Sequence, residues 1–190
     1  NVGTNLSNYF LPGTTMANIG SITARPLSAS LIGTVSKIYD GTNSATLSSA
    51  NFQIAGFIGT DSATVSTTSG TYATINAATG ISVSTTASLV ATGATLLGNY
   101  LLPGTIAGSI GTISQRQLTV TLIGSTSKVY DGTASVLVNS SNFSLTGFVQ
   151  GEGAVIGSQS GTLASPNVGN GITVTVVGNP QTVTPTGSTL

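Results

Sequence analysis

The stretch Lys37-Ile38-Tyr39-Asp40-Gly41-Thr42 occurs a second time in this chain, 91 residues further on, as Lys128-Val129-Tyr130-Asp131-Gly132-Thr133. The same spacing relates Leu11-Pro12-Gly13-Thr14 to Leu102-Pro103-Gly104-Thr105, and no gap is needed between the copies up to about Gly178. A fixed period of this length is typical of tandem repeats, in which each unit folds as one module.

The repeat predicts how the 190 residues are divided. We expect residues 1–25 to be the tail of a preceding unit, residues 26–116 a complete unit, and residues 117–190 a second, incomplete unit. A chain that begins in the middle of the pattern is expected to be a fragment of a longer protein.

Charged residues are few, and all of them follow the repeat. Lys and Arg number 4 and Asp and Glu number 4, which is 4% of the chain, against roughly 25% in an average domain. The corresponding positions are Arg25 and Arg116, Lys37 and Lys128, Asp40 and Asp131, and Asp61 and Glu152. Charges kept in register are expected to form ion pairs and turn contacts at the corners of the units or between units.

The composition argues against several function classes. A net charge of zero built from eight charges supplies no basic surface for nucleic acid or for an anionic membrane. Without His or Cys there is no Ser-His-Asp triad, no Cys nucleophile and no ordinary zinc site. No apolar stretch approaches the roughly 18 residues of a membrane span. We therefore expect a protein that is not an enzyme, binds no nucleic acid and does not insert into a membrane.

The apolar residues alternate with polar ones, which favours β-strands over helices. Leu27-Ser28-Ala29-Ser30-Leu31-Ile32 and its copy over 118–123 show this period, and Gly171–Val177 is rich in β-branched residues. Further predicted strands cover 45–48, 52–57, 62–67, 70–75, 80–90 and 106–114. Some seven short strands in about 90 residues favour an all-β fold of tandem immunoglobulin-like β-sandwich modules of 91 residues.

The repeated Tyr-Asp-Gly-Thr stretch has a local structural explanation. The carboxylate of Asp40 or Asp131 can accept a hydrogen bond from the backbone two residues on, and Gly41 or Gly132 accepts a positive φ. Tyr39 and Tyr130 are then expected to anchor the turn to the core. A ligand site at this turn is the alternative.

Aromatic residues also recur in pairs, and we expect them to fill the cores. Besides the turn tyrosines, the pairs are Tyr9 and Tyr100, Phe52 and Phe143, and Phe57 and Phe148. Asn99 and Tyr100 belong to the segment that closes each unit, so they are predicted anchors as well. A stacking platform for sugars would favour clustered Trp and Tyr, and the chain has no Trp.

These motifs together resemble a known family. The Tyr-Asp-Gly-Thr turn, the stretch Asn167–Thr175 and the closing stretch Gly98–Leu102 are similar to YDG-type and related MBG repeats. Such repeats occur in tandem in large bacterial exoproteins, including filamentous-haemagglutinin-like adhesins secreted by the two-partner route. The resemblance implies an extracellular or bacterial cell-surface location and no catalytic residues.

The expected function is structural: the repeat region of an adhesin shaft or of a secreted fibre. Its partners would be neighbouring repeats of the same chain or identical chains. A module that binds a host or matrix glycan or protein is one alternative, and a filament subunit joined by donor-strand exchange is another. The Thr-rich strands leave an ice- or surface-binding protein open. No cofactor is expected, and calcium, held by the two acids of each unit, is the one alternative considered.

Overall fold

The alternating segments form strands throughout the computed structural model, which describes residues 3–178 and 183–187. Within these residues there is no α-helix, and the only helical elements are four single 3-10 turns, η1 (Leu6–Asn8), η2 (Ser49–Asn51), η3 (Leu97–Asn99) and η4 (Ser140–Asn142). The all-β class predicted from the sequence is therefore confirmed.

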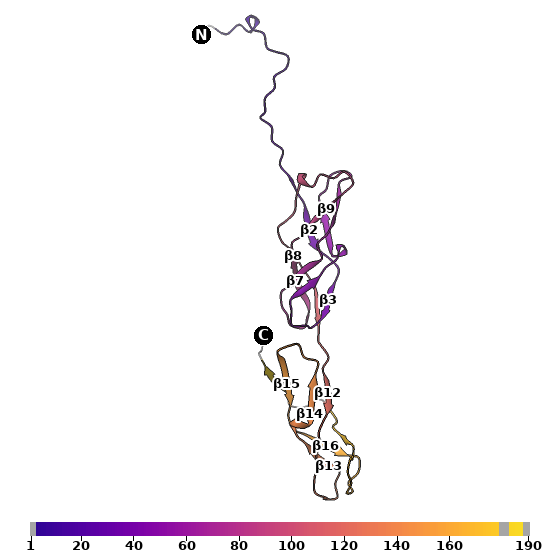
Figure 1. The fold of residues 1–190 in the computed structure, drawn as a ribbon. Helices are drawn as coiled ribbons and strands as arrows, with labels where there is room; N and C mark the ends of the chain where they lie inside the picture. Colours follow the sequence, from indigo (N-terminus) through magenta and orange to yellow (C-terminus); the bar gives the residue numbers. More distant parts are fainter. Residues whose placement is uncertain (1–2, 179–182, 188–190) are drawn as a thin grey trace.

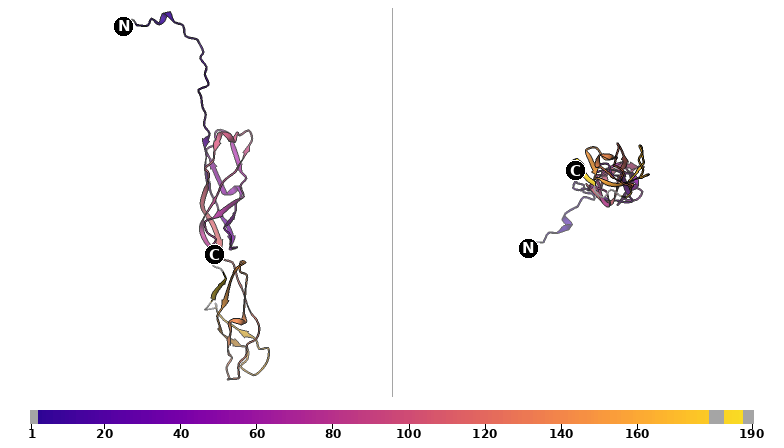
Figure 2. Two further views of the ribbon diagram at one scale, coloured as in Figure 1. Left: turned by 60° about the vertical axis from the view of Figure 1, so that its left-hand side comes forward. Right: turned by 90° about the horizontal axis from the view of Figure 1, so that it is seen from below.

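Two sets of strands pair only among themselves and form two units that follow one another along one axis (Figures 1 and 2). The first unit comprises β1 to β11, and the second comprises β12 to β18. Residues 115–118 connect them. Residues 3–24, called the tail below, extend away from the first unit on the side opposite the second.

The first unit is built on a five-stranded sheet in which the last strand is inserted between earlier ones. The sheet order is β3 (Val35–Ile38), β11 (Ile106–Ser114), β8 (Ala78–Thr85), β7 (Ser69–Tyr72) and β4 (Ser44–Thr46). β11 runs parallel to β3 and antiparallel to β8. The strand that closes the unit therefore lies inside its sheet and not at an edge.

Three short pairs complete the first unit. They are β2 (Ser28–Leu31) with β5 (Phe52–Ala55), β6 (Ser62–Val65) with β9 (Leu89–Thr92), and the parallel pair β1 (Arg25–Pro26) with β10 (Tyr100–Leu101). The strand predicted over 80–90 is thus two strands, β8 and β9, which belong to different sheets. β3 was not among the predicted strands.

The core of the first unit lies under β11. Ile106 and Ile113 of this strand are each only 2% exposed, and they pack in one cluster with Leu31, Val35, Ala45, Leu47, Phe52, Tyr72, Ile81 and Val83. Gly111 lets β11 pass close to the ring of Tyr72. A side chain at this position would clash, because its Cβ would lie 2.6 Å from Cε1 of Tyr72. Burial of apolar side chains on alternate positions holds the pairs and the sheet together.

The second unit repeats part of this plan. Its pairs are β12 (Thr119–Leu122) with β14 (Phe143–Thr146), β13 (Ser135–Val138) with β16 (Gln159–Leu163) and β17 (Val174–Thr175), and β15 (Glu152–Ile156) with β18 (Val183–Gly187). β18 lies three residues further along than β9 would place it, because Val65 pairs with Leu89 whereas Ile156 pairs with Val183. The sequence repeat breaks down at this place, after Gly178.

The strand predicted over Gly171–Val177 is reduced to the two residues of β17. In the first unit the corresponding strand, β8, pairs with β11 along one side and with β7 along the other. Among the described residues of the second unit no strand takes the place of β11. Residues 126–129, the counterpart of β3, likewise form no strand. High β-propensity alone does not make a strand without a neighbour to complete the ladder.

Candidate functional site at the turns and the joint

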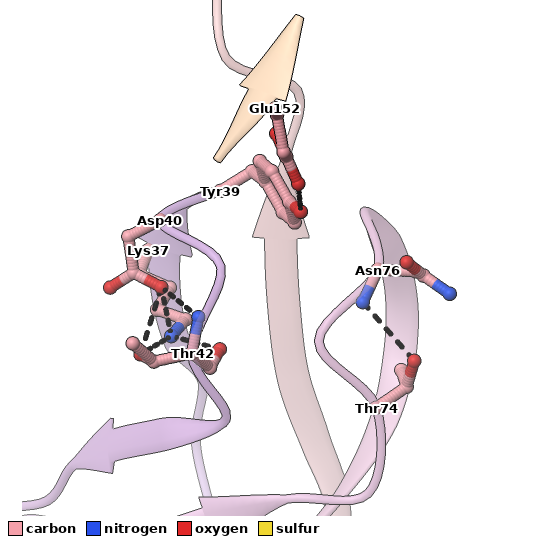
Figure 3. Close-up of polar contacts among 7 residues, drawn as sticks. All are labelled: Lys37, Tyr39, Asp40, Thr42, Thr74, Asn76 and Glu152. Atoms are coloured by element: carbon pink, nitrogen blue, oxygen red, sulfur yellow. Dashed lines mark hydrogen bonds and ion pairs between the residues drawn. The ribbon is translucent and has the colours of Figure 1, made fainter. Parts of the chain in front are cut away.

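The Tyr-Asp-Gly-Thr turn of the first unit is closed by a single carboxylate (Figure 3). Oδ1 of Asp40 accepts hydrogen bonds from the backbone N–H and from Oγ1 of Thr42, each at 2.9 Å. Nζ of Lys37 lies 2.7 Å from the same oxygen and also donates to the carbonyl of Thr42 at 2.6 Å. Gly41 adopts a φ of +77°, which only glycine adopts easily.

The second unit builds the same turn. Thr133 N donates to Oδ1 of Asp131 at 2.9 Å, Lys128 Nζ lies 2.6 Å from that oxygen, and Gly132 again has a φ of +77°. Lys128 also donates to the carbonyl of Ser135 at 2.8 Å. Because the two turns agree although the two units differ in their strands, this geometry follows from the local sequence.

The lysine hydrogen bond and the threonine N–H together lower the pKa of Asp40 and of Asp131 to about 2. Both carboxylates are therefore ionised at any ordinary pH, and they act as hydrogen-bond acceptors and not as proton donors. The lysine side chains are 16% and 20% exposed, so their charged ends are held by the turns.

Tyr39 connects the first unit to the second. Its hydroxyl donates to Oε1 of Glu152, which begins β15 of the second unit (Figure 3). This hydrogen bond is the main cause that raises the pKa of Tyr39 above its usual value, and desolvation of the hydroxyl raises it further. On the other side of the turn Val149 lies against Gly41, where an added Cβ would approach Cγ1 of Val149 to 2.9 Å. We call this contact region, formed by Tyr39, Gly41, Val149 and Glu152, the joint.

The turn tyrosines differ between the units. The Tyr39 ring is partly buried against the core cluster of the first unit, but its hydroxyl reaches outside that unit. Tyr130 is 62% exposed, so the prediction that it anchors its turn to a core is wrong in this structure. The reason is position: Tyr39 has a second unit to lie against, and Tyr130 has none among the described residues.

Tyr100 anchors the closing segment of the first unit. Its hydroxyl donates to Oδ2 of Asp61 at 2.5 Å and accepts from the backbone N–H of Ile58 at 3.2 Å. Its ring meets Phe57 edge to face, with the centroids 5.0 Å apart. The hydrogen bond to Asp61 raises the pKa of Tyr100. Asn99 is exposed and gives its backbone N–H to the Leu96 carbonyl at 3.0 Å, so the structure places the anchoring contacts on Tyr100.

The arginines hold a second repeated turn. Nε of Arg25 donates to the carbonyl of Gly56 at 2.8 Å, and Nε of Arg116 donates to that of Gly147 at 2.5 Å. With these contacts every one of the eight charged side chains takes part in an ion pair or hydrogen bond at a turn or at the joint. The sequence prediction for the charged residues is confirmed.

Sequence reasoning missed two parts of this framework. Asn51 and its counterpart Asn142 accept the backbone N–H of the residue before each 3-10 turn, and their amides donate to the carbonyls of Ile32 and Ile123. The sequence also did not predict that Val149 and Glu152 of the second unit contact the turn of the first unit at the joint. The available signal was the repeat itself, since Asn51 and Asn142 occupy the same position in each unit.

The described residues contain no group of three or more acidic side chains able to hold a metal ion. In the first unit Asp40 is bound by Lys37 and Thr42, whereas Asp61 is bound by Tyr100, so these two acids have different partners. No helix in the part of the chain that the structure describes is long and apolar enough to cross a membrane.

Comparison with known proteins identifies the repeated unit. The family model of the YDG domain matches residues 23–107 and again residues 114–189. Searches of the curated proteins and of the solved structures found no match.

Proposed function

The chain belongs to the YDG-domain family, with two domains in tandem, and on this premise we propose that it is a structural segment of a bacterial surface or secreted protein. In this proposal the units act as a stiff shaft or fibre segment, outside the cell, and perform no catalysis. Their partners are neighbouring units of the same kind.

The joint is the observation that carries the proposal. Only residues 115–118 separate β11 of the first unit from β12 of the second, which leaves no flexible linker. The two units also contact each other at the joint, through the hydrogen bond from Tyr39 to Glu152 and the contact of Val149 with the turn. A connection made at several points resists bending, and stiff serial connection is what a shaft requires.

The first unit also has the features of a self-sufficient module. In the first unit the five-stranded sheet and the pairs β2–β5 and β6–β9 contribute side chains to one apolar cluster. This supports our proposal that the units are immunoglobulin-like sandwiches with a pitch of 91 residues. Contacts between neighbours would then set the stiffness of the array.

An exposed extracellular shaft must also resist proteases. Trypsin cleaves after Lys and Arg, and the chain has four such residues. Arg25 precedes Pro26, a bond that trypsin does not cut, and Lys37 and Lys128 are held in their turns. The remaining position, Arg116, lies in the connection between the units. Cleavage there therefore reports on how firmly the joint is closed.

We would test the proposal by small-angle scattering at low concentration together with limited trypsin digestion. A compact globule of this length has a radius of gyration of roughly 16 Å, and we expect a clearly larger value and slow cleavage after Arg116. Tyr39→Phe should speed that cleavage, whereas the matched control Tyr130→Phe should not. A compact particle, or a connection cut equally fast in all three proteins, would contradict the stiff-shaft proposal.

A further inference from the structure

The chain enters and leaves the first unit at opposite ends (Figure 1). It passes from the tail into β1 at one end, and it leaves at the other end through β11, which leads into the second unit. A pull along the axis therefore draws β1 in one direction and β11 in the other. The contacts between the entering strands and the leaving strand decide how well the unit resists that pull.

The entering and leaving segments pair with each other twice, and both pairs are parallel. β1 pairs with β10 over two residues. β3 pairs with β11 over four residues, from Val35 opposite Gly111 to Ile38 opposite Ser114. The backbone N–H of Tyr39 extends this second ladder, because it donates to the carbonyl of Ser114 at 2.9 Å.

The parallel direction determines how these ladders are loaded. When the start of one strand and the end of its parallel neighbour are pulled apart, the two strands slide past each other along their length. The hydrogen bonds run from strand to strand, so all of them oppose the slide together. An antiparallel pair pulled in the same way would open from one end, one bond after another. Resistance to force depends on the rate of unfolding, which falls when many bonds must break at once.

β11 is held on its other side as well. It pairs antiparallel with β8 over a stretch that begins at Ile106 and ends at Ile113, and both isoleucines are 2% exposed. A slide of one residue would turn the apolar side chains of β11 from the core to the outer face. The strand therefore cannot slip in small steps without exposing its core contacts.

The Tyr-Asp-Gly-Thr turn fixes the end of β3. Lys37 lies in β3 opposite Ile113, and its Nζ donates to Oδ1 of Asp40 at 2.7 Å and to the carbonyl of Thr42 at 2.6 Å. The same Nζ lies 5.5 Å from the ring centroid of Tyr72, which belongs to β7 and is 1% exposed. Charge-assisted hydrogen bonds and the contact with the ring hold the lysine against the core. Before β3 can slide away from β11, this turn must open.

We propose that the first unit bears tension, with the parallel ladder between β3 and β11 as its clamp and the Tyr-Asp-Gly-Thr turn as the anchor of β3. Load that arrives at β1 passes along β2 into β3, crosses the ladder to β11, and leaves through residues 115–118 into the second unit. The inference deepens the proposed shaft function by adding resistance to pulling, and it rests on that function. It also gives the repeated turn a mechanical role.

Single-molecule force measurement on the 190-residue chain tests the clamp, because the chain has no Cys and introduced cysteines fix the points of pull. Thr23→Cys with Gln117→Cys pulls across the first unit alone and slides β3 past β11; both positions are exposed. Asn43→Cys with Gln117→Cys pulls at the exit end of both strands and peels the same ladder open. We expect the sliding pull to need a several-fold higher force and to release on the order of 300 Å of chain. Equal forces in the two directions would overturn the clamp.

Lys37→Met in the sliding pull tests the anchor, since it keeps a long side chain but removes the ammonium. We expect a clearly lower force. Lys128→Met is the matched control, because it removes the same contacts from the turn of the second unit, which this pull does not load. An unchanged force in Lys37→Met, or an equal drop in Lys128→Met, would overturn the anchor.

The shaft function is tested separately by particle shape and by cleavage after Arg116. An extended, trypsin-resistant particle whose first unit opens as easily by sliding as by peeling would refute tension bearing and leave the shaft standing. A compact particle would refute the shaft itself, whatever the force.

Discussion

Gly111 offers the sharpest test of how the first unit is closed. It is buried in β11 between β3 and β8, and a Cβ added there would lie 2.6 Å and 2.8 Å from two ring carbons of Tyr72 and 2.9 Å from the carbonyl oxygen of Ile81. Tyr72 is 1% exposed and cannot swing away, and the carbonyl belongs to the backbone of β8. Gly111→Ala therefore forces either the ring or the ladder to move.

The expected cost follows from two opposing effects. Overpacking of a filled core costs about 1–3 kcal/mol, and three contacts under 3 Å place this site at the upper end. Replacing glycine by alanine in a strand returns about 0.5–1 kcal/mol of backbone entropy. We expect Gly111→Ala to lower the free energy of unfolding of the first unit by about 2 kcal/mol.

Urea unfolding followed by tyrosine fluorescence measures this change, because the chain has no Trp and three of its five tyrosines, Tyr39, Tyr72 and Tyr100, lie in the first unit. With an m-value of about 2 kcal/mol/M the midpoint should fall by about 1 M. Gly104→Ala is the control, since nothing lies within 4 Å of its added Cβ. Equal stability of the two variants would refute the register of β11 between β3 and β8.

Three further predictions concern the polar framework. Tyr39→Phe should weaken the coupling between the units, seen as two separated unfolding transitions. Because the pKa of Tyr39 is raised, its contribution is present below about pH 10 and is lost as pH rises through the folded value, so alkaline unfolding of the wild type should approach that of the variant. Coincident transitions in Tyr39→Phe would speak against the joint. Because the pKa values of Asp40 and Asp131 are lowered from 3.8 to about 2, the free energy of unfolding should hold down to about pH 4 and decline toward pH 2 in urea titrations. The decline should be less steep in the Asp40→Asn and Asp131→Asn variants. An equally steep decline in these variants would exclude the turn carboxylates as its source. Tyr72→Phe removes a buried hydroxyl that has no hydrogen-bond partner among the described residues. Thermal melting of this variant should therefore show equal stability or a gain of up to about 1 kcal/mol. A clear loss of stability would point to a partner for that hydroxyl.

The joint within the chain has two parts. β11 leads through residues 115–118 into β12, while Tyr39 contacts Glu152 from the side. The closing strand of the first unit thus continues into the first strand of the second.

Local chemistry was readable from the sequence alone. The repeat, the all-β class and most strands of the first unit follow from alternation and spacing, because each depends on residues close together in the chain. The turn at Asp40 is determined within six residues, since a carboxylate, a glycine and a threonine N–H are brought together by the turn itself. The second unit keeps this turn although its sheet differs, which shows that nothing distant is needed.

Only the tertiary structure decided which strands are neighbours. β3 exists because β11, some 70 residues later, pairs with it. Residues 126–129 and most of 171–177 form no strand, and among the residues that the structure describes no such neighbour lies beside them. Tyr39 and Glu152 are 113 residues apart, and only the stacking of the units brings them together. A sequence pattern specifies which face of a strand is apolar, but the hydrogen bonds of a ladder require a partner whose place is set by the folded chain.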